Sequence, residues 1–219
     1  MQDSVKNLLQ IEKTIVSNLK ELNNHNKAKI IAVSKTFNLD KILPLINHGH
    51  ENFGENKVQE AIEKWTEIKK KNVNIKLHMI GKLQTNKVKF AVKLFDYIHS
   101  VDSQKLAKKI SDQEKVFNKK IKIFIQVNIG DEIQKSGINY DQVNDLVNYC
   151  KNLNLNVIGF MCIPPDVKEP GIYFEKMSKL NKKFGFSELS MGMSSDYIEA
   201  IKNNATYVRI GSSIFGKRI

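Results

Sequence analysis

Apolar residues recur along this chain as short runs that alternate with longer amphipathic segments. The segment Lys29–Val33 holds four consecutive apolar residues, and comparable runs lie at 76–80, 121–127 and 207–210. Short runs of this kind, rich in isoleucine and valine, are typical of parallel strands that are covered by helices on both faces. Between the runs, segments such as Val58–Lys71 carry apolar residues at helical spacing. The pattern therefore predicts an α/β chain of alternating strands and helices.

The number of these alternations indicates a particular α/β architecture. Counting from Lys29, strands and helices alternate eight times with short connections. Eight such units within the length of one domain fit a (β/α)8 TIM-type barrel better than an open doubly wound sheet. Before the first strand, apolar positions between Val5 and Leu22 form a helical stripe, which predicts an additional N-terminal helix. We therefore expect a single domain over residues 1–219, with a leading helix within 1–26 and the barrel at 29–212.

Composition narrows the class of protein further. The chain has no apolar run long enough to cross a bilayer and no N-terminal signal pattern, so we expect a soluble cytoplasmic protein without a membrane partner. Its only cysteines, Cys150 and Cys162, lack metal-site spacing and give no disulfide framework. The pair in His48-Gly49-His50 lacks a third ligand at suitable spacing, so a surface turn is expected there rather than a metal site.

The formal charge of +12 raises the question of nucleic-acid binding. Only Arg209 and Arg218 among the 35 basic residues are arginine, and the lysines are spread over the whole length. Proteins that read nucleic acids cluster their basic residues and favour arginine for bidentate contacts. We therefore expect general attraction of polyanions but no specific nucleic-acid partner.

Lys35 is the first candidate for a chemical role. It stands where a buried strand leaves the core, and such a strand needs no charged residue at its end. Partial desolvation at such a position favours the neutral amine, which can attack an aldehyde. Lysines at strand ends also commonly extend to solvent along their aliphatic stems, and the strand by itself leaves both interpretations open.

In a barrel, the carboxyl ends of all strands open at one mouth, where barrel enzymes build their sites. The loops after the seventh and eighth strands, Gly192–Ser195 and Gly211–Ser213, carry small residues whose backbone N–H groups can approach an anion. Each loop alone is also an ordinary turn. Together, at their places in the strand order, they predict a phosphate pocket. The residues expected at the mouth are Lys35, Asn56, Gly81, Ser100, Asn128, Met161, Ser194 and Gly211.

Arg209 lies inside the final strand, and its guanidinium cannot lose its charge by deprotonation. An inward arginine needs an acceptor, which is either a ligand atom or a carboxylate of the protein itself. A strand-end lysine, a phosphate pocket and this arginine at one mouth suggest a phosphorylated aldehyde held as an imine.

Several motifs, taken in order, are specific to a known family. The chain resembles the pyridoxal 5′-phosphate (PLP) homeostasis proteins, the YggS/PROSC group, which are similar to the barrel domain of alanine racemase standing alone. The resemblance covers nearly the whole chain. It rests on the motifs Ala32-Val33-Ser34-Lys35-Thr36, Phe53-Gly54-Glu55-Asn56 with Val58-Gln59-Glu60, His78-Met79-Ile80-Gly81 with Leu83-Gln84-Thr85-Asn86-Lys87, Gln126-Val127-Asn128-Ile129, Lys135-Ser136-Gly137, Gly159-Phe160-Met161 with Ile163-Pro164, Leu189-Ser190-Met191-Gly192-Met193-Ser194, and Val208-Arg209-Ile210-Gly211-Ser212 with Phe215-Gly216.

The resemblance implies PLP as cofactor and assigns roles to individual residues. Lys35 would form the Schiff base with the cofactor aldehyde, Asn56 would lie beside the ring, and Arg209 would face the pyridine nitrogen. His78 and Met193 would line the pocket.

The phosphate would be held by Ser194, Gly211 and Ser212. The run Ser194-Ser195-Asp196 differs from the family's usual Ser-x-Asp surroundings, which leaves open which serine reaches the phosphate.

The resemblance also implies the function. An arginine at the ring nitrogen disfavours protonation of the ring, which makes the ring a weaker electron sink. A racemase further needs a second acid/base, which similar enzymes take from another domain, whereas this chain stops at Ile219. We expect a non-catalytic, monomeric protein of PLP homeostasis that stores or delivers the cofactor, with transient contacts to PLP-dependent apo-enzymes. The alternative is a PLP-dependent amino-acid racemase-like enzyme.

Overall fold

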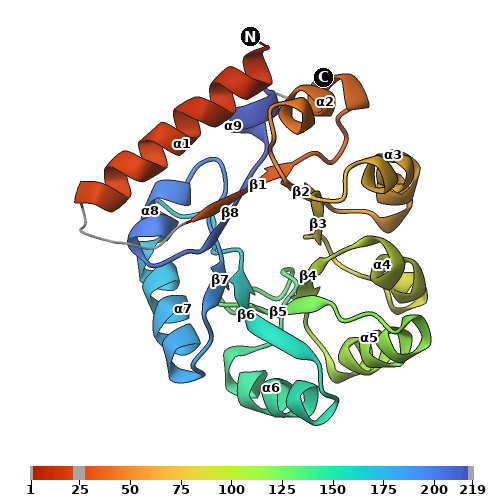
Figure 1. Ribbon diagram of the computed structural model, residues 1–219. Coiled ribbons are helices and arrows are strands. Elements are labelled where there is room, and N and C mark those ends of the chain that lie inside the picture. Colours follow the sequence, from red (N-terminus) through yellow and green to blue (C-terminus); the bar gives the residue numbers. More distant parts are fainter. Residues whose placement is uncertain (1, 22–27, 217–219) are drawn as a thin grey trace.

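The computed structural model describes residues 2–21 and 28–216 of the chain. Eight strands pair in parallel and in sequence order, and the last pairs with the first, so that the sheet closes into a barrel (Figure 1). This architecture confirms the predicted (β/α)8 fold. The strands are β1 (Lys29–Val33), β2 (Asn52–Glu55), β3 (Lys76–Met79), β4 (Tyr97–Val101), β5 (Lys122–Val127), β6 (Asn156–Cys162), β7 (Glu188–Ser190) and β8 (Tyr207–Ile210).

Helices surround the barrel and connect each strand to the next (Figure 1). Helix α3 has the bounds that its apolar spacing predicts. Two other expected helices begin with a short 3-10 turn, η1 (Thr85–Lys87) and η2 (Tyr140–Gln142). The α-helices are α1 (Asp3–Glu21), α2 (Leu39–Asn47), α3 (Val58–Lys71), α4 (Val88–Leu94), α5 (Gln104–Phe117), α6 (Val143–Asn152), α7 (Gly171–Lys183), α8 (Tyr197–Lys202) and α9 (Ser212–Phe215).

Local sequence signals explain where helix α5 begins and ends. Ser103 precedes it, and its side-chain oxygen accepts a hydrogen bond from Leu106 N, which satisfies one of the free N–H groups of the first turn. Asn118 follows it with φ 45°, a left-handed conformation that asparagine tolerates at a helix end. Ser103 is therefore the N-terminal cap of α5.

Helix α1 is the expected leading helix. Its apolar stripe, which includes Leu8, Ile11 and Ile15, is buried, and the helix contacts α2, α8 and α9. The remaining positions of the predicted 1–26 segment, Met1 and 22–26, lie outside the described residues, as does Arg218. No helix in the described ranges is both long and apolar enough to span a bilayer.

Side chains fill the barrel interior, as is general for this fold. A compact cluster of Ile31, Tyr97, Phe124, Met161 and Tyr207 occupies it, and each is at most 7% exposed. The interior position of Met161 differs from the expectation that it lies at the mouth, because β6 continues past it to Cys162. Ser100 is likewise inside β4 rather than after it.

Candidate functional site

A cavity of about 400 Å³ opens at the carboxyl ends of β1 and β8. It brings together seven of the eight residues that the sequence proposes for the site, namely all except His78. The lining residues are Val33, Lys35, Phe37, Asn56, Ile80, Ile163, Met193, Ser194, Ser195, Arg209, Gly211, Ser212 and Gly216.

Lys35 and Asn56 follow the first two strands and lie on one side of this cavity. Each residue follows its strand within two positions and is half-buried. Asn56 is packed closely by Gly81, where a Cβ atom would lie 2.4 Å from the Asn56 carbonyl oxygen, so only glycine fits after β3. Strand ends therefore determine where the amine and the amide face the cavity.

The loops after β7 and β8 form the other side. Ser213 N donates a hydrogen bond to Ser194 Oγ over 3.4 Å, which joins the two loops that the sequence predicts to form a phosphate pocket. The first loop is shaped by Gly192, whose φ of 89° suits glycine, and by Asp196, whose Oδ1 accepts from Met193 N. Both Ser194 and Ser195 line the cavity, Ser194 half-buried and Ser195 exposed.

Arg209 reaches the cavity from inside the barrel and is only 5% exposed. Nη1 donates to Ser190 Oγ over 2.7 Å, and Nη2 donates to the Cys162 carbonyl oxygen over 2.8 Å. These acceptors are a hydroxyl and a carbonyl, not the protein carboxylate that was the alternative partner. Burial lowers the pKa of the guanidinium from its ordinary value, but arginine stays charged at neutral pH. The arrangement fixes a permanent cation beneath the mouth.

His78 lies deeper in the barrel and does not line the cavity, because its side chain is directed toward Asn52 at the start of β2 and not toward the carboxyl ends of the strands. Its Nδ1 lies 2.9 Å from His99 Nε2, and its Nε2 lies 3.1 Å from Asn52 Oδ1. His99 Nδ1 in turn lies 2.9 Å from Ser190 Oγ. A continuous chain of hydrogen bonds thus runs from Asn52 through both histidines to Arg209.

The protonation of this chain follows from its two ends. Asn52 Oδ1 can only accept, so His78 Nε2 carries the proton and His78 Nδ1 accepts from His99 Nε2. His99 Nδ1 is then an acceptor for the Ser190 hydroxyl, which itself accepts from Arg209. Burial lowers the pKa of both histidines well below the usual range, which agrees with two neutral rings. Every bond in the chain is consistent with one direction of donation.

Replacing Ser190 with alanine should destabilise the protein by about 2–4 kcal/mol, because the change leaves a buried Arg209 donor and a buried His99 acceptor unpaired. Urea unfolding measures the loss. Ser178→Ala is the matched control, since the Ser178 hydroxyl accepts one exposed hydrogen bond from Asn204 and its removal should cost less than about 0.5 kcal/mol. Equal stability of the two variants would contradict the assigned chain.

Several lining residues have no assigned role in the sequence-based site. Phe37 stacks on Phe215 with ring centroids 4.8 Å apart, which ties the segment after β1 to α9. Its position two residues after Lys35 is the only sequence signal that could have found it. Ile80 and Ile163 lie in motifs of the resemblance and supply apolar walls. Their contribution depends on tertiary packing that a linear pattern does not reveal.

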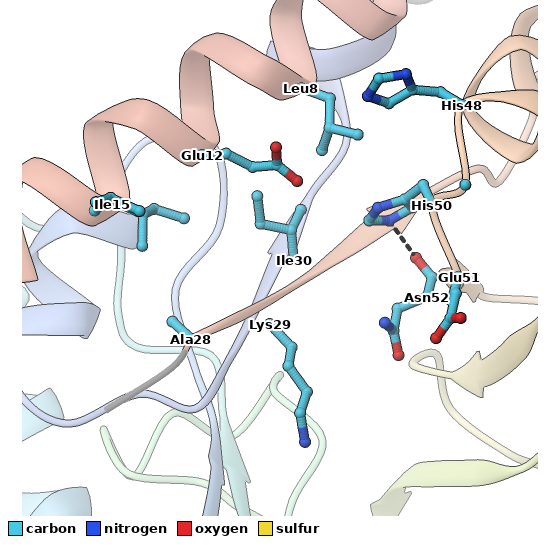
Figure 2. A pocket seen from close by; sticks show the side chains of 12 residues that line it. Leu8, Glu12, Ile15, Ala28, Lys29, Ile30, His48, His50, Glu51 and Asn52 are labelled. Atoms are coloured by element: carbon cyan, nitrogen blue, oxygen red, sulfur yellow. Dashed lines mark hydrogen bonds between the residues drawn. The ribbon is translucent and has the colours of Figure 1, made fainter. Parts of the chain in front are cut away.

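A second cavity, of about 540 Å³, lies at the opposite end of the barrel between α1 and the starts of β1 and β2 (Figure 2). His50 belongs to it and is held by the Asn52 carbonyl oxygen, 2.9 Å from Nε2. Among the described residues, no group of three metal-ligating side chains converges here or elsewhere. This cavity lies away from the mouth where barrels build their active sites.

Known proteins resemble this chain over most of its length. A family model described as the N-terminal domain of alanine racemase matches residues 12–218. A pyridoxal phosphate homeostasis protein of Haemophilus influenzae is 37% identical over 224 residues, which cover 97% of this chain and 94% of the relative. The chain belongs to the pyridoxal phosphate homeostasis protein family. The family resemblance read from the sequence motifs is thereby confirmed.

Two solved structures resemble the fold of this chain. PipY of Synechococcus elongatus PCC7942, a structure with PLP bound, is 31% identical with a TM-score of 0.79, covering 92% of this chain and 100% of that chain. Alanine racemase of Clostridium difficile 630 is 16% identical with a TM-score of 0.70, covering 94% of this chain and 56% of that chain. The second likeness establishes the fold alone.

Proposed function

We propose that this protein binds PLP non-catalytically and serves in PLP homeostasis by storing and delivering the cofactor. The observation that carries the proposal is the convergence of Lys35, Arg209 and the serine-rich loops on one cavity of about 400 Å³. Relatives named for PLP homeostasis and the PLP-bound PipY structure support it.

The residues around the cavity fit the functional groups of PLP. The cofactor supplies an aldehyde that a lysine amine can hold as an imine with release of one water. Lys35 provides that amine, and Arg209 offers N–H donors to the pyridine nitrogen. Asn56 lies on the Lys35 side for contact with the ring. Donors for the phosphate come from the two adjacent loops, with Ser194, Gly211 and Ser212 as the proposed contacts and Met193 beside them.

The alternative of a racemase-like enzyme has less support from the same cavity. A racemase moves a proton between two faces of its substrate and needs an acid/base group on each. Among the described residues that line the cavity, Lys35 is the only titratable side chain besides Arg209, which keeps its proton. An arginine partner also leaves the ring a weak electron sink. A binding role therefore accounts for the lining residues better than turnover does.

Absorbance with added PLP tests the proposal. Binding through an amine should give a visible imine band that borohydride removes, and mass mapping should then find the reduced adduct on Lys35. The same sample, incubated with L- and D-amino acids, should leave their chirality unchanged. Absence of the band after incubation with PLP would contradict the proposal. Racemisation of the amino acids would instead show that the protein is a racemase-like enzyme.

Further aspects of the function stay predictions. The protein is expected to act as a monomer in the cytoplasm and to meet PLP-dependent apo-enzymes transiently. Transfer of PLP from the loaded protein to an apo-enzyme, followed by recovery of that enzyme's activity, would measure such delivery.

A further inference from the structure

The turn that carries Lys35 has an unusual backbone. Thr36, the next residue, has φ 66°, in the left-handed region. A β-branched residue is strained there and persists in such a conformation only where its surroundings hold it. The structure should therefore contain groups that hold this turn, and such groups would also control where the Lys35 amine lies.

A cluster of three charged side chains binds the residues on both sides of Lys35, two of them through the backbone and one through a side chain. Lys64 Nζ donates to the Ser34 carbonyl oxygen over 2.9 Å, before Lys35, and Thr36 N donates to Glu60 Oε1 over 2.5 Å, after it. The third member, Glu55, accepts at Oε1 from the Ser34 hydroxyl over 2.7 Å. We call Glu55, Glu60 and Lys64 the turn clamp.

The members of the turn clamp also bind one another. Lys64 Nζ lies 3.0 Å from Glu55 Oε1 and 3.0 Å from Glu60 Oε1. Trp65 Nε1 donates to Glu55 Oε1 over 2.9 Å, which anchors the clamp in the core. Burial raises the pKa of Glu60, but the bond from Thr36 N and the Lys64 ammonium outweigh it, so the pKa is lowered and the carboxylate stays charged. The clamp thus joins the end of β2 and the first turns of α3 to the turn after β1.

Core stability does not account for this cluster. Glu55 is 0% exposed, and its Oε2 has no hydrogen-bond partner among the described residues. A buried carboxylate carries a desolvation penalty, and well-packed apolar residues often replace a buried ion pair without loss of stability, so stability does not require charges here. What the charges provide instead is directed hydrogen bonding to residues 34 and 36.

The clamp also explains motif positions that the cofactor site leaves without a role. Glu55 directly precedes Asn56, which lines the cavity, and Glu60 lies on the helix that follows. One short segment therefore supplies both a wall of the cavity and the support for Lys35 on the same side.

We propose that Glu55, Glu60 and Lys64 are positioning residues that hold the turn at 34–36 and so set how readily Lys35 bonds to the cofactor aldehyde. The inference rests on the proposed PLP-binding function. Holding the turn in one conformation raises the fraction of molecules whose amine faces the cavity, and the apparent affinity follows that fraction.

Glu60→Ala is the primary test, because the Glu60 side chain is 27% exposed and its removal leaves the buried Lys64–Glu55 pair intact. With PLP in excess, the imine band should grow about tenfold more slowly than in wild type, and half-saturation should need about tenfold more PLP. Glu60→Gln keeps an oxygen that accepts from Thr36 N, so it should restore both values to within about threefold.

Glu67→Ala is the matched control on the same helix, since Glu67 pairs only with exposed Lys70 in the ion pairs of the described structure. It should leave the band unchanged. All rates are measured well below the temperature at which each variant unfolds. If Glu60 only stabilised the fold, its removal would lower the unfolding temperature but would not change the rate at which the imine band grows. If the wild-type protein forms the imine band and Glu60→Ala forms it at the same rate, the clamp proposal is overturned and the proposed function stands. If the wild-type protein forms no band, the proposed function is overturned and the clamp proposal with it.

Lys64→Met is the harsher variant, because it removes the cation beside the buried Glu55 carboxylate. If it folds, its band should grow more slowly than that of Glu60→Ala, and a Lys64→Met protein with wild-type kinetics would also overturn the clamp. Lys70→Met, at an exposed position of the same helix, controls for loss of a lysine charge.

Discussion

The variant Lys35→Ala should form no visible imine band at any PLP concentration, and borohydride should add no cofactor mass to it. Lys35 is the only lysine that the described residues bring to the cavity beside Arg209 and the serine loops. An imine needs a primary amine, so its loss cannot be compensated by Arg209, whose guanidinium keeps its proton. Because Lys35 is half-buried at the rim, the unfolding free energy should change by less than about 1 kcal/mol.

Lys82→Ala is the control for this experiment. Lys82 is exposed, follows Gly81 after β3, and is absent from the lining of the cavity. It should keep the full band and a single adduct on Lys35. A band of wild-type intensity in Lys35→Ala, with the adduct mapped to another lysine, would show that the cavity at the carboxyl ends of β1 and β8 is not where the aldehyde is held.

The hydrophobic pattern predicted most of the fold, because apolar residues recur with one spacing in strands and with another in helices. The bounds of α3 and β8 agree with the pattern residue for residue. The predicted strand ends were wrong where the spacing of apolar residues does not show where the strand stops. The expected end of the sixth strand came before Met161, but apolar residues continue to Cys162, and pairing with β5 extends that far. Tertiary pairing, which a single segment does not encode, decides such ends.

The candidate site was predictable to the extent that strand order places residues at one mouth. Lys35 and Gly211 follow β1 and β8, which are neighbours only because the barrel closes. His78 belongs to a motif that ends at the mouth, yet its place within β3 directs it to His99 in the interior. The turn clamp was not foreseen, because Glu60 and Lys64 read as ordinary polar positions of an amphipathic helix. Their partners, 24 and 30 residues away, appear only in the folded chain.

Acid should destabilise this protein well above the pH at which carboxylates titrate. Burial lowers the pKa of His78 and His99, and the positive charges of Lys29, Lys122 and Arg209 lower it further. In the unfolded chain both histidines return to a pKa of about 6.5. The unfolded state therefore binds more protons below that pH, so stability is fully present above it and falls as the pH falls.

Between pH 7 and pH 5 each of the two histidines should remove about 2 kcal/mol, or about 4 kcal/mol together, a large part of the stability of an ordinary domain. His50, whose pKa burial lowers to about 4, acts in the same direction. Urea unfolding followed by the fluorescence of buried Trp65 measures the change. His99→Gln removes one titrating group and should reduce the slope of stability against pH by about 1 kcal/mol per unit, averaged over this range. A urea midpoint that stays constant from pH 7 to pH 5 would show that the interior histidines are not held neutral, and the direction of hydrogen bonding from Arg209 to Asn52 would then have to be reassigned.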